Sequence, residues 1–153
     1  MAKNAYVIGV DVPGTKEEVW ATIADVKSYP NWTSILSLSD NDEVEIGKQF
    51  NVVISKKGRT LSQFKATLIG KEEYHFFSAR QTMLGRWFFS ATHHFIVEEN
   101  NGQVRFIQSW DFTGVLYGLF KKQIFKLLDV FKIMNEELRV HMQKQNQPSI
   151  TNN

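Results

Sequence analysis

The sequence contains no cysteine, which excludes disulfide bonds, thiolate nucleophiles and cysteine metal ligands. Its charges nearly balance, with a formal net charge of +2 at pH 7, so nothing in the overall charge favours a nucleic-acid partner. No apolar run approaches the roughly 18 residues of a membrane-spanning helix, and residues 1–6 show no apolar segment followed by a cleavage site. We therefore expect a cytoplasmic protein without integral membrane association.

Familiar catalytic motifs are also missing. The sequence has no phosphate-binding glycine loop, no nucleophile elbow and no zinc-protease motif. His93 and His94 are adjacent, but neighbouring residues of a strand point to opposite faces, so the pair does not form a metal site. We expect no metal and no cofactor.

Aromatic residues are abundant by contrast. The 153 residues include 12 phenylalanines, 4 tryptophans and 4 tyrosines, most of them between positions 76 and 131. Aromatic side chains suit either a dense core or an apolar ligand pocket. The length fits one domain with a substantial core. We expect that domain to span residues 1–144, followed by a polar, disordered tail over 145–153.

A long amphipathic stretch occupies residues 116–142. Its apolar residues recur at steps of three and four, which is one stripe of a helix: Phe120, Ile124, Leu127, Leu128, Phe131, Met134 and Leu138. No proline or glycine interrupts the stretch after Gly118. The pattern predicts one unbroken helix of about 40 Å at 1.5 Å per residue.

The N-terminal quarter combines a strand with two short helices. Residues 3–12 alternate and are rich in β-branched side chains, which predicts a strand. Thr15 and Glu18 form a capping box that begins a helix over about 16–25. Pro30 prevents this helix from simply continuing, so residues 28–32 form a second short turn of helix.

Five further strands are predicted after a loop over residues 37–43. They span about 44–56, 60–70, 73–82, 86–98 and 103–113, separated by turn signals such as Asn101-Gly102. Consecutive strands joined by short turns form an antiparallel meander. The fold class is therefore α+β: a curved antiparallel sheet of about six to seven strands wrapped around the long C-terminal helix, with two short helices after the first strand.

Several motifs resemble the START-like superfamily (SRPBCC), the birch-pollen-allergen-like helix-grip proteins, and especially their polyketide cyclase/dehydrase-like branch. They are residues 12–20 (Val-Pro-Gly-Thr-Lys-Glu-Glu-Val-Trp), 29–32 (Tyr-Pro-Asn-Trp), 110–114 (Trp-Asp-Phe-Thr-Gly) and 134–138 (Met-Asn-Glu-Glu-Leu), with Phe95 and Asn101-Gly102. The resemblance implies a cavity between sheet and helix for a lipid, sterol, hormone or polyketide. Some such proteins are cyclases, so it does not select one function.

Alternation along the strands predicts which side chains face the cavity. On 103–113, Gln108 shares the inward face with Trp110, and on 86–98 His93 shares it with Phe95. The inward face of 73–82 is ambiguous. His93 and Gln108 are therefore the polar groups expected in an aromatic interior, where they either orient a ligand or bond internally to the backbone or to water. Asn135 lies on the helix stripe, with a structural bond favoured over a ligand contact.

The residues expected to contact a hydrophobic small molecule are Trp32, Phe50, Val52, Phe64, Trp87, Phe89, His93, Phe95, Gln108, Trp110, Phe120, Ile124, Leu128 and Phe131. We favour a non-enzymatic binding or carrier role. One alternative is an aromatase/cyclase- or dehydratase-like enzyme that uses His93, with Gln108 holding a carbonyl oxygen. Another is a filled core and a surface interaction module, including a homodimer, through the outward-facing Phe88 and Ile96.

Overall fold

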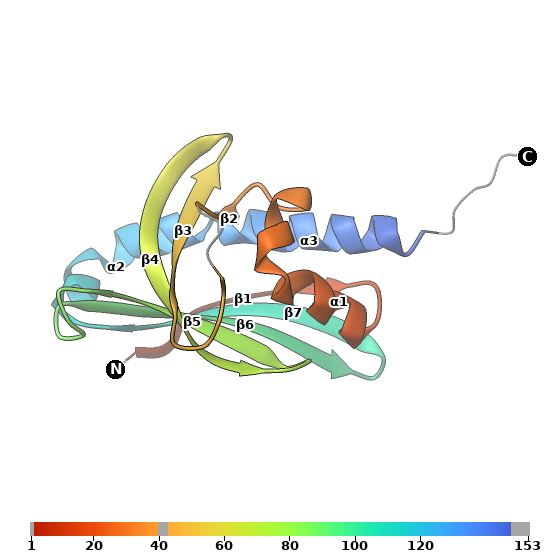
Figure 1. Ribbon diagram of the computed structural model, residues 1–153, viewed down its shortest axis with the longest axis horizontal. Helices are drawn as coiled ribbons and strands as arrows, with labels where there is room; N and C mark the ends of the chain where they lie inside the picture. The colour runs from red at the N-terminus through yellow and green to blue at the C-terminus, as the bar shows by residue number, and fades with distance from the viewer. Residues whose placement is uncertain (1, 40–42, 148–153) are drawn as a thin grey trace, which may run out of the picture.

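A computed structural model describes residues 2–39 and 43–147. It has the expected α+β helix-grip architecture, a curled antiparallel sheet covered by C-terminal helices (Figure 1). In chain order the elements are β1 Ala2–Val12, α1 Lys16–Ala24, the 3₁₀ helix η1 Val26–Asn31, β2 Leu36–Leu38, β3 Gln49–Lys56, β4 Arg59–Glu72, β5 Phe76–Met83, β6 Phe89–Asn100, β7 Gln103–Thr113, α2 Val115–Leu128 and α3 Phe131–Gln145.

The start of α1 follows the capping-box prediction. The Thr15 hydroxyl accepts a hydrogen bond from the Glu18 backbone N–H at 3.1 Å, and the Glu18 carboxylate accepts one from the Thr15 N–H at 2.9 Å. These two bonds satisfy N–H groups that a helix start leaves without partners. The apolar face of α1 is buried, so the cap fixes where that face meets the sheet.

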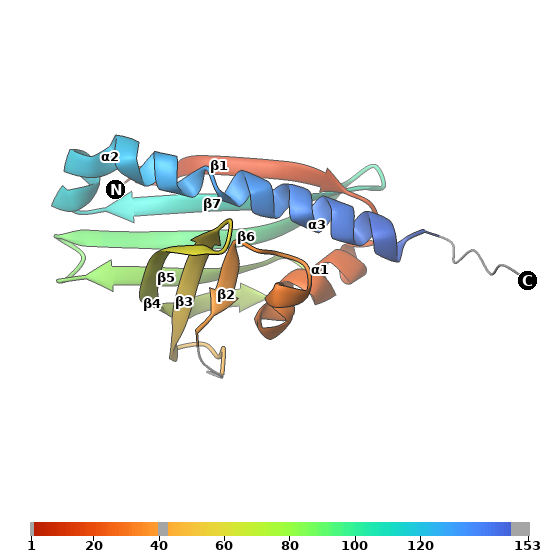
Figure 2. The ribbon, with the colours of Figure 1, turned by 90° about the horizontal axis from the view of Figure 1, so that it is seen from above.

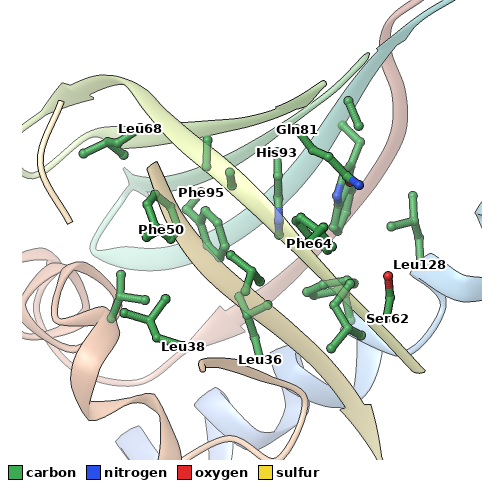
Figure 3. Close-up of a pocket in the computed structure, with 18 of the residues that line it drawn as sticks. Leu36, Leu38, Phe50, Ser62, Phe64, Leu68, Gln81, His93, Phe95 and Leu128 are labelled. Atoms are coloured by element: carbon green, nitrogen blue, oxygen red, sulfur yellow. The ribbon is translucent and has the colours of Figure 1, made fainter. Parts of the chain in front are cut away.

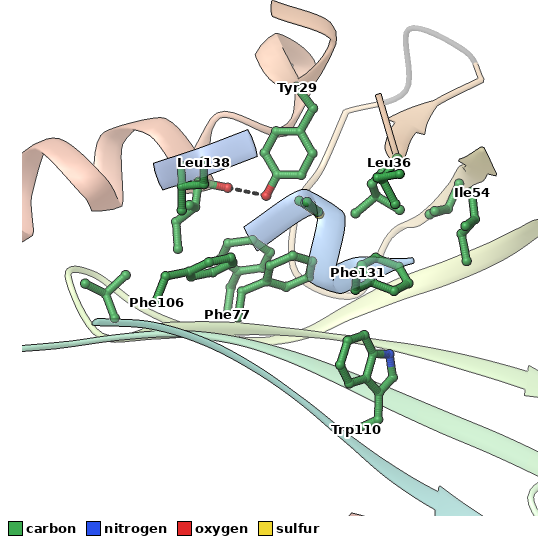
Figure 4. Close-up of a cluster of buried hydrophobic side chains, with 14 of the residues drawn as sticks. Tyr29, Leu36, Ile54, Phe77, Phe106, Trp110, Phe131 and Leu138 are labelled. Atoms are coloured by element: carbon green, nitrogen blue, oxygen red, sulfur yellow. Dashed lines mark hydrogen bonds between the residues drawn. The ribbon is translucent and has the colours of Figure 1, made fainter. Parts of the chain in front are cut away.

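Tyr29 anchors η1 in the core. Its ring is fully buried and its hydroxyl donates to the Ile23 carbonyl at 2.6 Å (Figure 4). Pro30 lies inside η1, where it has no N–H to donate and breaks the α-helical pattern. The second short helix is therefore confirmed as a 3₁₀ segment.

The sheet is a meander in the spatial order β1-β7-β6-β5-β4-β3-β2, and every neighbouring pair is antiparallel. The predicted strand 103–113 matches β7, whereas β3 begins five residues later than expected. The short β2 lies partly inside the expected loop 37–43, of which residues 40–42 fall outside the described part of the chain. Its alternation of Leu36, Ser37 and Leu38 is a strand signal too short to stand out.

The prediction that a strand begins at residue 86 is wrong, because β6 begins at Phe89. Leu84 and Gly85 both have positive φ, at 52° and 85°, and the Gly85 carbonyl accepts hydrogen bonds from the N–H groups of Phe88 and Phe89 at 3.2 Å each. Residues 84–88 therefore form a turn, and the inward alternation does not extend back to Trp87.

The prediction of one unbroken C-terminal helix is also wrong. Asp129 and Val130 separate α2 from α3, and the Val130 N–H bonds three residues back to Leu127 at 3.3 Å. A straight helix would set residues 128 and 130 about 200° apart, yet Leu128, Val130 and Phe131 are all buried. The tightened turn lets all three face the interior, and α3 follows α2 along the sheet (Figure 2).

Helix α3 extends into the predicted tail. It ends at Gln145, and the Asn146 side chain donates to the Met142 carbonyl at 2.8 Å. The rest of the expected tail, residues 148–153, lies outside the described residues.

Candidate functional site

A cavity of about 200 Å³ lies between the sheet and α2 (Figure 3). This is below the roughly 300–1,000 Å³ of most ligand pockets, but well above the water-sized gaps of a filled core. Its walls are formed by Val26, Tyr29, Leu36, Leu38, Val44, Phe50, Val52, Ile54, Ser62, Phe64, Ala66, Leu68, Phe77, Ala79, Gln81, Phe89, Ala91, His93, Phe95, Trp110, Phe112, Ile124, Leu127, Leu128 and Phe131.

Most of the predicted contact residues lie in this wall. They are Phe50, Val52, Phe64, Phe89, His93, Phe95, Trp110, Ile124, Leu128 and Phe131. The structure also resolves the ambiguous strand, because Phe77, Ala79 and Gln81 of β5 face the cavity. Strand alternation therefore located the sheet side of the cavity correctly.

Two predicted contacts lie on the outer surface instead. Trp87 belongs to the β5–β6 turn and is 71% exposed, and Phe120 on α2 is 45% exposed. Phe120 has a non-helical backbone, with φ of −120° and ψ of 24°, which interrupts the predicted stripe. Neither residue lines the cavity.

Trp32 and Gln108 are buried but do not line the cavity either. The Trp32 ring packs edge-on against Tyr29, with 4.9 Å between ring centroids, and stacks near His141 of α3. Trp32 is therefore a packing residue. Gln108 is fully buried behind His93 and takes part in a hydrogen-bond chain.

His93 is held within an aromatic cluster. Its ring stacks between Phe95 and Trp110, with centroids 4.0 and 4.1 Å away, and Phe131 meets it edge-on at 5.1 Å. The pairing of His93 with Trp110 across β6 and β7 creates one of these contacts. Figure 3 shows the side chain pointing from β6 into the space between sheet and helix.

A chain of three polar side chains connects this cluster to α3. His93 Nε2 lies 2.8 Å from Gln108 Oε1, and Gln108 Nε2 donates to Asn135 Oδ1 at 2.7 Å. Asn135 thus makes a structural bond, as the sequence favoured. The chain crosses from the sheet to the C-terminal helix, so it fixes the position of α3 relative to His93.

The same chain determines the protonation of His93. Because the Gln108 amide nitrogen donates to Asn135, its Oε1 must accept, and His93 Nε2 carries the hydrogen. Nδ1 is then an acceptor, and it has no hydrogen-bond partner among the described residues. His93 lines the cavity, so a ligand bound there would lie against this ring.

Burial keeps His93 neutral. Desolvation lowers its pKa from 6.5 to about 3, against the hydrogen bond to Gln108, which raises it. No Asp, Glu, Lys or Arg of the described chain lines the cavity, and the Tyr29 hydroxyl is already committed to Ile23. An ionised ligand would lose its hydration without gaining a counter-charge. The site therefore suits an uncharged molecule.

A second histidine cluster lies on the opposite face of the sheet. Ser78 Oγ lies 2.6 Å from His94 Nδ1, and His94 Nε2 lies 2.8 Å from Asp111 Oδ2. Sequence reasoning missed this group because its members come from three strands. Ser78 is only 3% exposed, so a substrate does not reach its hydroxyl, and the cluster cross-links β5, β6 and β7.

Metal and membrane features were searched over the described residues. Within them, no group of three or more His, Asp or Glu side chains is arranged to hold a metal ion. No helix in that part of the chain is long and apolar enough to cross a bilayer.

Several wall residues were not foreseen as contacts. Leu36 and Leu38 come from the unpredicted β2, and Val26 and Tyr29 come from η1. They close the side of the cavity away from α2. Their own local patterns are short, so only the folded arrangement of β2 beside β3 reveals their role.

Solved structures with the same fold include polyketide enzymes and a START protein. The di-domain aromatase/cyclase StfQ from the steffimycin biosynthetic pathway superposes with a TM-score of 0.67 at 10% identity, over 92% of this chain and 51% of that one. The aromatase/cyclase Zhui from a Streptomyces species gives 0.63 at 9% identity, over 93% and 94%. A START superfamily protein from Mycobacterium smegmatis gives 0.63 at 12% identity, over 92% and 98%.

Comparison at the level of sequence does not assign the chain to a family. No family profile matches the chain, and no curated protein matches it either. The chain spans about half the length of the di-domain StfQ. At these identities the likeness establishes the fold, which is the START-like, polyketide cyclase-like helix-grip fold.

Proposed function

We propose that this START-like helix-grip protein binds a compact, uncharged hydrophobic molecule, lipid-, sterol- or polyketide-like, in the cavity between sheet and α2. The observation that carries the proposal is the cavity itself: a largely apolar wall whose polar side chains include Ser62, Gln81 and His93, with no hydrogen-bond partner for His93 Nδ1 among the described residues. A few polar groups orient a ligand whose affinity comes mainly from apolar contact. The ligand that fits this arrangement presents a hydroxyl or other hydrogen-bond donor to His93.

The enzymatic alternative has less support from this geometry. A general base works best with a pKa near the operating pH, whereas burial lowers that of His93 to about 3. The Gln108 amide, which was to hold a carbonyl oxygen, is already engaged, because its Oε1 accepts a hydrogen bond from His93 and its Nε2 donates one to Asn135. Because aromatase/cyclases share the fold, we retain an enzyme as the second hypothesis. Ligand binding fits the site better, because it requires no basic His93.

The structure also bears on the alternative that the protein is a surface interaction module. Phe88 and Ile96, which motivated it, are each half-buried, and Phe88 packs against the core. The core is not filled, because the cavity remains. The more exposed apolar residues include Leu84 and Trp87 in the same turn as Phe88.

Binding can be tested with four matched two-ring probes: naphthalene, 2-naphthol, 2-methoxynaphthalene and 2-acetylnaphthalene. We expect all four to bind, and 2-naphthol to bind about fivefold more tightly than its methyl ether, because one hydrogen bond contributes on the order of 1 kcal/mol. Titration calorimetry or displacement of a fluorescent probe measures the affinities. A folded protein that binds none of them would refute the proposed function.

The His93→Phe variant tests whether His93 is the residue that forms a hydrogen bond with the ligand. It keeps an aromatic ring in the stack but removes Nδ1, so we expect the preference for 2-naphthol to disappear. Phe64→Leu is the control, since it alters the apolar wall and should weaken all four probes alike. A preference for 2-acetylnaphthalene would show that the ring donates rather than accepts. The ¹⁵N shifts of the His93 ring report the tautomer directly in the unmutated protein.

A further inference from the structure

Exposed apolar side chains gather at one end of the molecule. Of the twelve large hydrophobic residues that are exposed within the described part of the chain, half belong to the end of β5, the β5–β6 turn and the start of α2. We call them the apolar tip: Met83, Leu84, Trp87, Val115, Leu119 and Phe120. In Figures 1 and 2 these elements lie together at the end opposite the C-terminus. Leu84, Trp87 and Leu119 are exposed by 74%, 71% and 70%.

The two segments of the tip are held together by backbone hydrogen bonds. The Val115 N–H donates to the Trp87 carbonyl at 3.0 Å, and the Leu116 N–H donates to the Phe88 carbonyl at 2.9 Å. The Thr113 hydroxyl donates to the Arg86 carbonyl at 3.3 Å. The turn and the helix start therefore form one rigid projection, and its apolar side chains are displayed together.

The two chain segments that form the tip carry charges of one sign. Residues 75–97 and 112–128 contain no Asp or Glu, but they contain Arg80, Arg86, Lys121, Lys122 and Lys126. Arg86, Lys121 and Lys122 are exposed next to tip residues, and Lys121 and Lys122 form no ion pair within the described residues. The near-neutral charge of the whole chain hides this local excess.

We propose that the apolar tip docks the protein on an anionic lipid membrane. Tryptophan favours the membrane interface, large apolar side chains insert among the acyl chains, and adjacent Lys and Arg residues are attracted to anionic headgroups. A membrane buries the apolar side chains among its acyl chains and places anionic headgroups beside the surrounding cations. A second copy of this chain would bring the same cations face to face, which costs energy through like-charge repulsion.

The tip also adjoins the cavity wall. Met83 lies two residues beyond the wall residue Gln81 on β5, and Phe120 lies one helical turn before the wall residue Ile124 on α2. Docking would therefore place the membrane beside the cavity. The docking itself does not depend on the cavity ligand, so it stands or falls separately from the proposed binding function.

Vesicle binding tests the proposal on the full chain. The protein is mixed with vesicles of equal parts phosphatidylcholine and phosphatidylserine, or of phosphatidylcholine alone. We expect binding to the anionic vesicles that weakens as salt is added. Trp20, Trp32 and Trp110 are buried and Trp87 is exposed, so a blue shift in tryptophan emission and quenching by brominated lipid report entry of Trp87 into the bilayer.

Two pairs of variants separate the apolar and the electrostatic parts. Trp87→Ser with Leu119→Ser should lower the partition coefficient at least tenfold. The control, Val7→Ser with Ile46→Ser, changes two apolar residues that are also exposed but lie away from the tip, and it should not lower the coefficient. Lys121→Gln with Lys122→Gln should lower it about 30-fold, since each cation near the surface contributes about a factor of five. Lys65→Gln with Lys71→Gln is the exposed charge-matched control.

Three outcomes would overturn the proposal. The first is no binding to anionic vesicles at low salt. The second is equal binding to uncharged vesicles, which removes the role of the cations. The third is a dimer in light scattering that Trp87→Ser dissociates, which would assign the apolar tip to a second copy of the chain.

Discussion

His93 illustrates how burial changes the use of a titratable residue. In the unfolded chain its pKa is near 6.5, but in the aromatic cluster desolvation lowers it to about 3. The residue therefore remains a neutral hydrogen-bonding group over the physiological range. Alternation along the strand correctly predicted its inward direction, but not the stacking on Phe95 and Trp110 that removes its basicity.

This shift makes stability depend on pH. Between pH 6.5 and 3 the unfolded state binds a proton at position 93 that the folded state does not, so stability falls as the pH falls. We expect a loss of about 2 kcal/mol from this residue between pH 7 and pH 5. Urea denaturation at the two pH values measures it.

The His93→Phe variant isolates this contribution. We expect it to be less stable at pH 7, because Gln108 Oε1 loses its partner, but to lose less stability on acidification. An equal loss in both proteins would mean that other groups cause the acid sensitivity.

At the scale of elements, the junction between β7 and α2 depends on one glycine. Gly114 has φ of 105°, and a Cβ atom there would lie 2.4 Å from the Phe88 carbonyl oxygen. The close approach is what lets the α2 start bond to the β5–β6 turn. The sequence predicted a strand over 103–113 that stops before Gly114, but not that the lack of a side chain at Gly114 lets two distant segments meet.

We expect Gly114→Ala to destabilise the protein by about 3 kcal/mol or more, through backbone strain and overpacking. Gly118→Ala is the matched control, since nothing lies within 4 Å of a Cβ built there and alanine favours a helix by about 1 kcal/mol. Urea denaturation compares the two. Similar stabilities for both variants would contradict the assigned role of Gly114.

Two of the errors in the predicted elements, the early start of β6 and the unbroken helix, depend on tertiary structure. The β6 start was placed too early because the turn conformation of Leu84 and Gly85 is not visible in an apolar run. The helix break at Asp129 and Val130 has no glycine or proline to signal it. It arises because Val130 is buried together with Leu128 and Phe131, a requirement that the sheet imposes.

At the scale of the whole molecule, the cavity makes the fold less stable than it would be with a filled core. A filled core would add dispersion contacts that the aromatic walls now lack. Ala79 lines this space opposite His93 on the neighbouring strand. A larger side chain there should therefore stabilise the fold at the expense of the binding site.

We expect Ala79→Val to keep or raise stability, by up to about 1 kcal/mol, while weakening 2-naphthol binding at least tenfold. Thermal unfolding and calorimetry measure the two effects. Thr60→Val, on an exposed part of β4, is the control and should change neither. Undiminished binding in Ala79→Val would place the ligand outside the cavity.

The sequence by itself determined the order and type of most elements, although not β2 or the break between α2 and α3, together with the antiparallel meander, the cap of α1 and the inward faces of most strands. These properties follow from periodicity and turn residues, which act between near neighbours in the chain. Tertiary structure decided the size of the cavity, the hydrogen-bond partners of Gln108, the exposure of Trp87 and Phe120, and the meeting of two acid-free segments at one end. Those features depend on contacts between residues far apart in sequence, which no local pattern encodes.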